Sequence, residues 1–279
     1  MKIGAHVSVA GGLVNCFKNA EKIEAEVVQI FGCSPMKWSV KKPTEAEILE
    51  FKKEHKKSKV GPIFLHASYL VNLGSPSEKL WHASISNLAG HLKIAEDIGA
   101  DGLVFHVGSG KDSSKKEAIV RAIEGMKRVL KEVPGKTSLI IENSAGAGLK
   151  LGNTLEEIGE MFSGVKDKRI KVCLDTAHIF EAGILKYTPK EITNFVKVCD
   201  KEFGWKNVVC IHLNDSKTEF DSKHDRHENV GEGFIGLKSF QNLAKNKDFS
   251  KVPWILEVPG FDNKGPDKKN IDILKKMEN

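Results

Sequence analysis

The chain has 279 residues, of which 40% are hydrophobic and 29% charged, and its net charge is +6. This length suits one large domain or two small ones, and the composition excludes a disordered or fibrous protein. No stretch approaches the roughly 20 apolar residues of a membrane span, and the start MKIGAHVSVAGG lacks the apolar core of a signal peptide. We therefore expect a cytoplasmic protein without a membrane partner.

The cysteines are odd in number and show no CxxC spacing, which argues against a disulfide framework or a cysteine zinc site. They are Cys16, Cys33, Cys173, Cys199 and Cys210. The mildly basic charge is compatible with an anionic partner such as nucleic acid, although many enzymes share it.

Short apolar runs recur along the whole chain. Most are continuous rather than alternating, which is typical of strands covered on both faces of a parallel sheet. They cover residues 2–7, 27–32, 62–67, 103–108, 138–143, 171–176, 208–213 and 253–258.

Segments with helical patterning lie between these runs. Five begin with a capping box, in which a hydroxyl and a glutamate three residues later satisfy free N–H groups at the helix start. The pairs are Thr44 with Glu47, Ser75 with Glu78, Ser114 with Glu117, Thr154 with Glu157, and Thr188 with Glu191. Pro76 and Pro189 then occupy the first helical position. Further helices are expected near 11–24, 236–246 and 267–277.

Eight strands, each followed by a helix, predict right-handed βαβ units and a parallel sheet. Eight such units in about 250 residues match a closed (β/α)8 TIM barrel with its active site at the C-terminal face of the strands. We expect a single domain of this kind over residues 1–279. The alternative is an open doubly wound sheet, but no G-x-G-x-x-G follows the first strand.

Six consecutive strands end in a side chain that can bind a metal ion. These are His66, His106, Glu142, Asp175, His212 and Glu257. The ends of barrel strands converge at one face, where barrel enzymes keep their active sites. Any one of these side chains could be structural, but burying six such groups without partners would be costly.

Three further candidates lie outside the strands. His178 follows Asp175 by three residues, and Asp225 and His227 are two apart on an extended segment, so they share a face. One divalent ion takes about three or four protein ligands, so nine candidates indicate two or three ions. Ions bridged by a carboxylate polarise a phosphoryl oxygen and generate hydroxide, which suits a phosphodiester substrate. Imidazole with carboxylate favours zinc and also accepts Mn²⁺ or Fe²⁺.

A set of segments spans nearly the full chain: GAHVSVAGG (4–12), HASYLVNLGSP (66–76), HVGSG (106–110), IENSAGAG (141–148), LDTAHIFEAG (174–183), HLNDSK (212–217), DRHENVGEG (225–233) and LEVPG (256–260). Together they resemble the signature motifs of endonuclease IV, the zinc-dependent apurinic/apyrimidinic endonuclease family. The resemblance implies a (β/α)8 barrel with three zinc ions. It also implies cleavage of duplex DNA 5′ to abasic sites, leaving a 3′-hydroxyl.

The resemblance further implies three ligand sets. They are His66, His106 and Glu142 for the first zinc, Glu142, Asp175, His212 and Glu257 for the second, and His178, Asp225 and His227 for the third. In the implied mechanism a metal-bound hydroxide attacks phosphorus in line, Glu257 helps to orient it, and the third zinc stabilises the departing 3′-oxygen. Glu142 and Glu257 are therefore the expected catalytic carboxylates.

The expected partner is duplex DNA that contains abasic sites. Tyr69 and Leu70 match residues that the family inserts at the lesion, where an aromatic ring can replace lost base stacking, at roughly 1–3 kcal/mol per base. Met36 stands where many members carry a long polar or cationic side chain, and a methionine can still act as an apolar wedge. Lys37 is the expected phosphate contact.

Two other functions fit part of this pattern. A sugar or sugar-phosphate isomerase or epimerase of the xylose-isomerase-like barrels would also place His, Asp and Glu at strand ends, but needs fewer metals. A damaged-DNA-binding protein without catalysis would require a broken metal site, whereas all nine candidates are present. We expect the endonuclease, acting as a monomer and without an organic cofactor.

Overall fold

Eight parallel strands close into a barrel in the computed structural model, which describes residues 1–111 and 113–277. The strands are β1 (Ile3–His6), β2 (Val28–Phe31), β3 (Ile63–His66), β4 (Gly102–His106), β5 (Ser138–Glu142), β6 (Ile170–Asp175), β7 (Val208–His212) and β10 (Trp254–Leu256). Their order around the barrel is β1-β10-β7-β6-β5-β4-β3-β2. The predicted TIM barrel is therefore confirmed.

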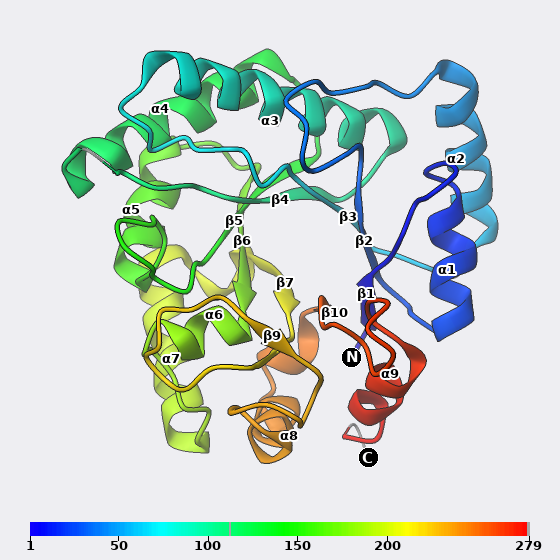
Figure 1. Cartoon of the computed structure of the whole chain (residues 1–279), viewed down its shortest axis with the longest axis vertical. Coiled ribbons are helices and arrows are strands. Elements are labelled where there is room, and N and C mark those ends of the chain that lie inside the picture. The colour runs from blue at the N-terminus through cyan, green and yellow to red at the C-terminus, as the bar shows by residue number, and fades with distance from the viewer. Residues whose placement is uncertain (112, 278–279) are drawn as a thin grey trace.

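Helices surround the strands as an outer ring (Figure 1). They are α1 (Asn15–Ile23), α2 (Glu45–Lys57), α3 (Glu78–Ile98), α4 (Lys115–Glu132), α5 (Leu155–Val165), α6 (Thr176–Glu181), α7 (Pro189–Phe203), α8 (Leu237–Lys245) and α9 (Lys268–Lys275), with short 3-10 turns at Trp205–Asn207 (η1) and Phe249–Lys251 (η2). Among the helices of residues 1–111 and 113–277, none combines the length and the apolar content that crossing a bilayer requires.

Three of the five predicted capping boxes form, at Thr44, Ser114 and Thr188. The box predicted at Ser75 is wrong: α3 starts at Glu78 with Ser77 as its N-cap, so Pro76 lies before the helix. Ser75 is buried and its hydroxyl instead accepts the N–H of Ser77 in a turn.

The predicted capping box at Thr154 forms only in part. The Thr154 hydroxyl accepts the N–H of Glu157 at 3.2 Å, as predicted. The Glu157 carboxylate turns away from the cap residue, because it accepts the N–H of Gly152 at 3.0 Å and pairs with Lys115.

Buried apolar side chains form two clusters, because residues of a strand alternate between two faces. The larger cluster packs the strands against the helices. The smaller one comes from the other face, inside the barrel, and contains Val27, Phe64, Val104, Ile140, Cys173, Cys210 and Ile255. The barrel interior is thus a packed core that ends, toward the carboxyl ends of the strands, at the candidate site.

The segment that follows β7 forms more structure than a solvated loop. A small antiparallel pair, β8 (Asp215–Ser216) and β9 (His227–Glu228), closes its base. Residues 218–223 are attached to α6. The ring of Phe220 packs edge-on against the ring of Phe180, with 5.3 Å between the ring centroids. The backbone N–H of Asp221 donates to Phe180 O. This attachment fixes the path of the chain toward Asp225.

Candidate metal centre

Every barrel strand places a polar side chain at the same end of the barrel. In seven strands this residue lies two positions beyond an apolar residue of the interior cluster, so it continues the same face. The pairs are Val27 and Gln29, Phe64 and His66, Val104 and His106, Ile140 and Glu142, Cys173 and Asp175, Cys210 and His212, and Ile255 and Glu257. Gly4 and His6 hold the corresponding positions of β1. One layer of polar side chains therefore covers the apolar interior.

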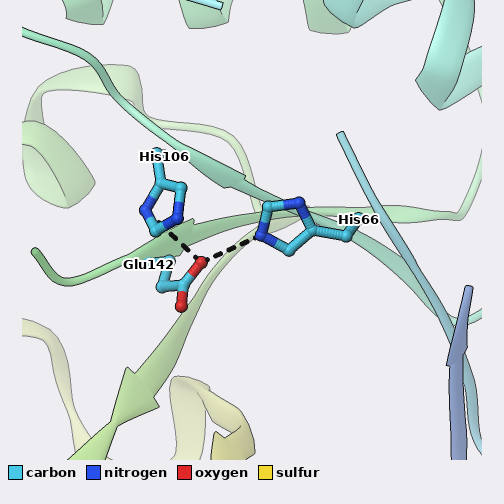
Figure 2. Close-up of side chains that lie close together, drawn as sticks. All are labelled: His66, His106 and Glu142. Carbon is cyan, nitrogen blue, oxygen red and sulfur yellow. Dashed lines mark hydrogen bonds and ion pairs between the residues drawn. The ribbon is translucent and has the colours of Figure 1, made fainter. Parts of the chain in front are cut away.

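The first group consists of His66, His106 and Glu142, from three neighbouring strands (Figure 2). Glu142 Oε2 lies 3.1 Å from His66 Nε2 and 3.5 Å from His106 Nδ1. Because Glu142 and His66 are buried, the carboxylate and the ring contact each other with little access to solvent. Two imidazoles and one carboxylate form a ligand set that zinc accepts.

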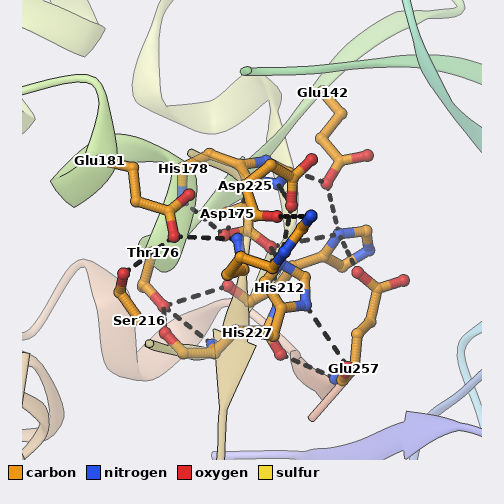
Figure 3. Close-up of polar contacts among 12 residues, drawn as sticks. Glu142, Asp175, Thr176, His178, Glu181, His212, Ser216, Asp225, His227 and Glu257 are labelled. Atoms are coloured by element: carbon orange, nitrogen blue, oxygen red, sulfur yellow. Dashed lines mark hydrogen bonds and ion pairs between the residues drawn. The ribbon is translucent and has the colours of Figure 1, made fainter. Parts of the chain in front are cut away.

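The second group consists of Glu142, Asp175, His212 and Glu257 (Figure 3). Its centre is His212 Nδ1, which lies 2.8 Å from Glu142 Oε1, 3.3 Å from Glu257 Oε2 and 4.0 Å from Asp175 Oδ2. The other oxygen of Glu142 belongs to the first group. This carboxylate therefore connects the two groups, as a bridging ligand would.

The third group joins His178 and His227 with two carboxylates. Asp175 lies close enough to both histidines to be a ligand, with Oδ2 3.6 Å from His227 Nε2 and Oδ1 3.9 Å from His178 Nδ1. Asp225 Oδ1, the carboxylate that the resemblance implies, lies 3.2 Å from His178 Nε2 and 3.8 Å from His227 Nε2. Asp175 thus stands between the second and third groups, in the way that Glu142 stands between the first and second.

The rings of His66 and His178 are oriented as those of metal ligands commonly are, with Nδ1 toward a backbone carbonyl and Nε2 toward a carboxylate of the groups. His66 Nδ1 donates to Ala67 O at 2.9 Å, and His178 Nδ1 donates to Asn143 O at 3.0 Å. Since a carbonyl can only accept, these nitrogens carry the proton and Nε2 carries the lone pair. Among the described residues, the buried Nε2 atoms of His178 and His227 have no hydrogen-bond partner. Both atoms instead face the carboxylate of Asp225, at 3.2 and 3.8 Å, and this arrangement fits a cation that binds between the three side chains.

The electrostatics of the groups favour positive charge. Burial opposes ionisation of Glu142, but the imidazoles of His106 and His212 outweigh it and hold the pKa of this carboxyl well below its usual range. Burial likewise opposes protonation of His212, yet the carboxylates of Glu257 and Glu142 raise its pKa to about 10. The cluster therefore strongly prefers positive charge, which protons on the imidazoles or divalent cations can supply.

Buried amides hold the carboxylates of the cluster in place. Asn214 Nδ2 donates to Asp175 Oδ2 at 2.6 Å, and its Oδ1 accepts the N–H of Glu257 at 2.8 Å. Asn143 Oδ1 accepts the N–H of Asp175 at 2.6 Å. The contact with Asp175 Oδ2 stabilises this carboxylate in its ionised form, and the other two fix the backbone from which Asp175 and Glu257 project.

Glu181 is a buried carboxyl group that the sequence interpretation did not single out. Its Oε1 accepts hydrogen bonds from Ser216 Oγ at 2.8 Å and from Arg226 N at 3.1 Å (Figure 3). Burial raises its pKa to about 7. Through Arg226, this side chain attaches the segment that carries Asp225 and His227 to helix α6.

A cavity of about 1190 Å³ opens over the three groups. Its lining includes His66, His106, His178, Asp225, His227 and Glu257, together with loops that follow β1 and β2. Tyr69, 58% exposed, and Lys37 also line it, whereas Met36, 69% exposed, and Leu70 are not among the described lining residues. Of the four residues expected to contact DNA, the structure therefore places two at the cavity wall and two outside it.

Comparison with known proteins relates this barrel to a family. Residues 17–277 match the family model described as "Xylose isomerase-like TIM barrel". The chain is 36% identical to the probable endonuclease 4 of Aquifex aeolicus, over 98% of this chain and 96% of that one. The crystal structure of endonuclease IV from Thermus thermophilus superimposes with a TM-score of 0.87, at 30% identity over 99% of this chain and 98% of that one.

The chain belongs to the endonuclease IV family. The resemblance found in its motifs is confirmed, and with it the expected enzyme class, a hydrolase of the apurinic/apyrimidinic endonuclease type. A D-tagatose 3-epimerase-like protein also superimposes, with a TM-score of 0.76, over 99% of this chain and 97% of that one, but at 17% identity. That similarity shows the shared barrel fold alone.

Proposed function

We propose that this chain hydrolyses the phosphodiester 5′ to abasic sites in duplex DNA and leaves a 3′-hydroxyl, using three zinc ions. The observation that supports this most strongly is the sharing of carboxylates between adjoining groups. Glu142 belongs to the first and second groups, and Asp175 to the second and third. Adjoining ions suit a reaction in which the attacking and the leaving oxygen both carry negative charge.

Each ion has a proposed ligand set. The first ion is held by His66, His106 and Glu142, the second by Glu142, Asp175, His212 and Glu257, and the third by His178, Asp225 and His227. Asp225 is preferred to Asp175 for the third ion because its Oδ1 faces Nε2 of both histidines, whereas Asp175 approaches His178 at the protonated Nδ1. When bound, such ions supply a hydroxide near neutral pH and stabilise charge on the leaving oxygen. Mn²⁺ is a chemically acceptable substitute for zinc.

The carboxylate of Glu257 is proposed to orient the attacking water. It lies at the cavity wall, its side chain is 18% exposed, and Oε2 faces the second group. Since His212 and the amide of Gln29 hold this carboxylate, it can accept a hydrogen bond from water in a fixed direction. Glu142 is proposed to hold the first two ions at a fixed separation, so it acts through the ions that it binds.

The proposed DNA contacts come from two residues of the cavity wall, Tyr69 and Lys37, and from their chain neighbours Leu70 and Met36. Tyr69 presents an exposed ring beside His66, with a centroid separation of 5.9 Å, so a base or sugar at the lesion can pack against it. Leu70 would fill the remaining space at the lesion. The ammonium of Lys37 would bind a backbone phosphate, and the exposed Met36 would act as an apolar wedge in the base stack.

A duplex with a single abasic site, labelled at its 5′ end, tests the proposal. We expect one cut on the 5′ side and a product that a DNA polymerase extends, since extension requires a 3′-hydroxyl. An excess of chelator is expected to abolish the cut and added Zn²⁺ to restore it. An intact duplex of the same sequence is the control. Metal analysis that gives one ion per chain, or a cut on the 3′ side, would contradict the proposal.

The proposed active form is a monomer, and the competing function is a sugar isomerase or epimerase. Sedimentation of the zinc-loaded chain, with and without the abasic duplex, measures whether the active form is a monomer.

The competing function, a sugar isomerase or epimerase, predicts turnover of a ketose or ketose phosphate with a single ion. Chelator-sensitive conversion of such a sugar, without cleavage of the duplex, would favour the isomerase.

A further inference from the structure

Gln29 is the polar side chain that β2 contributes to the layer above the barrel interior. It follows the interior residue Val27 by two positions, as Glu257 follows Ile255. The side chain is fully buried. A buried amide requires partners for two N–H donors and one carbonyl oxygen, because leaving them unpaired is costly.

All three requirements of the Gln29 amide are met by the candidate site. Nε2 lies 2.5 Å from Glu257 Oε1 and 3.1 Å from His6 Nδ1. Oε1 lies 2.8 Å from His212 Nε2. One amide therefore connects two residues of the second metal group that are far apart in sequence.

The partners fix which way the amide faces. A carboxylate can only accept hydrogen bonds, so the Gln29 atom beside Glu257 must be the nitrogen. The carbonyl oxygen then faces the His212 ring, and His212 Nε2 must donate to it. In the neutral ring that a metal ion requires, the lone pair of His212 consequently lies on Nδ1, the atom that faces Glu142, Asp175 and Glu257.

We infer that Gln29 is a positioning residue of the second metal group, which directs the lone pair of His212 and one carboxylate oxygen of Glu257 toward a shared ion. His6 completes the arrangement, since its Nδ1 accepts the second N–H of the amide and its ring packs against Phe31 at 4.4 Å. Gln29 is not among the described residues that line the cavity, so it acts through its two neighbours. The inference rests on the proposed function, because it requires that the second group binds an ion.

Two substitutions separate the contacts of the amide. Gln29→Met keeps the length of the side chain and removes all three hydrogen bonds. Gln29→Glu keeps an acceptor for His212 Nε2 but removes the donor to Glu257. The matched control is Gln241→Met, which makes the same chemical change on the outer helix α8.

The first measurement is ion binding, which requires no DNA. Zinc release is followed in competition with a chromophoric chelator, and Co²⁺ is used as a spectroscopic probe of ligand geometry. We expect Gln29→Met to weaken the binding of one ion by about 10- to 100-fold, the usual effect of removing a residue that hydrogen-bonds to a metal ligand. The Co²⁺ spectrum is expected to change as well. Thermal unfolding of both Met variants in chelator tests whether they fold.

The second measurement is cleavage of the abasic duplex. Gln29→Met and Gln29→Glu are both expected to lower kcat with little change in KM. Gln29→Glu is expected to retain its ions, because it keeps the acceptor for His212 Nε2 although it loses the donors to Glu257 and His6. A folded Gln29→Met variant with wild-type zinc affinity and Co²⁺ spectrum would overturn the inference, and so would wild-type kcat in Gln29→Glu. If the wild-type chain binds zinc but does not cut the duplex, the proposed function fails, whereas the ion-binding comparison still decides the role of Gln29.

Discussion

Asp225 Oδ1 lies 3.2 Å from His178 Nε2, although Asp225 belongs to the segment between β8 and β9 and His178 to helix α6. Both ends of this contact are anchored independently. Asp175 accepts the N–H of His178 at 2.9 Å, and Glu181 accepts the N–H of Arg226. The third metal group therefore depends on the docking of one segment against one short helix.

Glu257→Gln is expected to separate binding from catalysis. The amide keeps the size of the side chain, but it no longer presents a carboxylate toward His212 Nδ1, which lies 3.3 Å from Glu257 Oε2. We expect abasic duplex to bind within a few-fold of wild type and single-turnover cleavage to fall by about 10²- to 10⁴-fold. The control is Glu232→Gln, an exposed carboxylate of the segment DRHENVGEG (225–233). Cleavage at the wild-type rate would remove Glu257 from the reaction.

Tyr69→Ala is expected to weaken recognition of the lesion. The ring is 58% exposed and packs edge-on against Phe31 at 5.6 Å, so it is available to a stacked base. Loss of one stacking contact is worth roughly 1–3 kcal/mol, or about 5- to 150-fold in affinity for the abasic duplex. Tyr69→Phe keeps the ring and is expected to bind as wild type does. Equal discrimination between abasic and intact duplex in Tyr69→Ala would refute the stacking role.

Asp215→Ala is expected to destabilise the fold without removing a metal ligand. This carboxylate is buried and accepts the backbone N–H groups of Gly231, Gly233 and Ile235 at 2.9, 3.1 and 2.9 Å. Leaving several buried donors unpaired costs about 3–5 kcal/mol in the free energy of unfolding, measured by urea denaturation. Glu219→Ala, which removes an exposed carboxylate nearby, is the control. Equal stability of the two variants would show that water replaces Asp215.

His91 makes the stability of the fold depend on pH. The side chain is fully buried on α3, and burial lowers its pKa to about 4 from 6.5. As the pH falls from 6.5 to 4, the unfolded chain takes up a proton that the folded chain resists. The folded state therefore loses stability across this window, by at most about 3 kcal/mol from this residue.

His91→Leu is accordingly expected to lose less stability than wild type between pH 7 and pH 4.5. Urea denaturation at both pH values measures this, with chelator present throughout so that release of ions does not contribute. His82→Leu, at an exposed position of the same helix, controls for the loss of an imidazole. Parallel losses in wild type and His91→Leu would show that His91 does not contribute.

The sequence predicts the barrel and the positions of the six candidate ligands at strand ends because both depend on local order. Continuous apolar runs identify the strands. The residue that ends each run lies at the barrel mouth, and this position does not depend on how the helices pack. The placement of Asp175 between two groups could not be predicted in this way. It depends on distances between strands, and these follow from the closure of the barrel.

Gln29 illustrates what the sequence interpretation missed. Its partners Glu257 and His212 come from strands at the other end of the chain. One signal was present, since Gln29 is the only polar residue within the run VVQIF and follows an interior residue by two positions, as His66 does in β3. Residues 218–223 are a second case, because their contacts with α6 depend on the packing of Phe220 against Phe180.

Strand β6 passes into helix α6 without an intervening loop, since Asp175 is both the last residue of the strand and the N-cap of the helix. One residue inserted after Asp175 would rotate His178 by about 100° around the helix axis and advance it by about 1.5 Å. Its ring would then point away from the barrel mouth. The D-x-x-H segment is thus constrained in length as well as in composition: the number of residues between Asp175 and His178 cannot change.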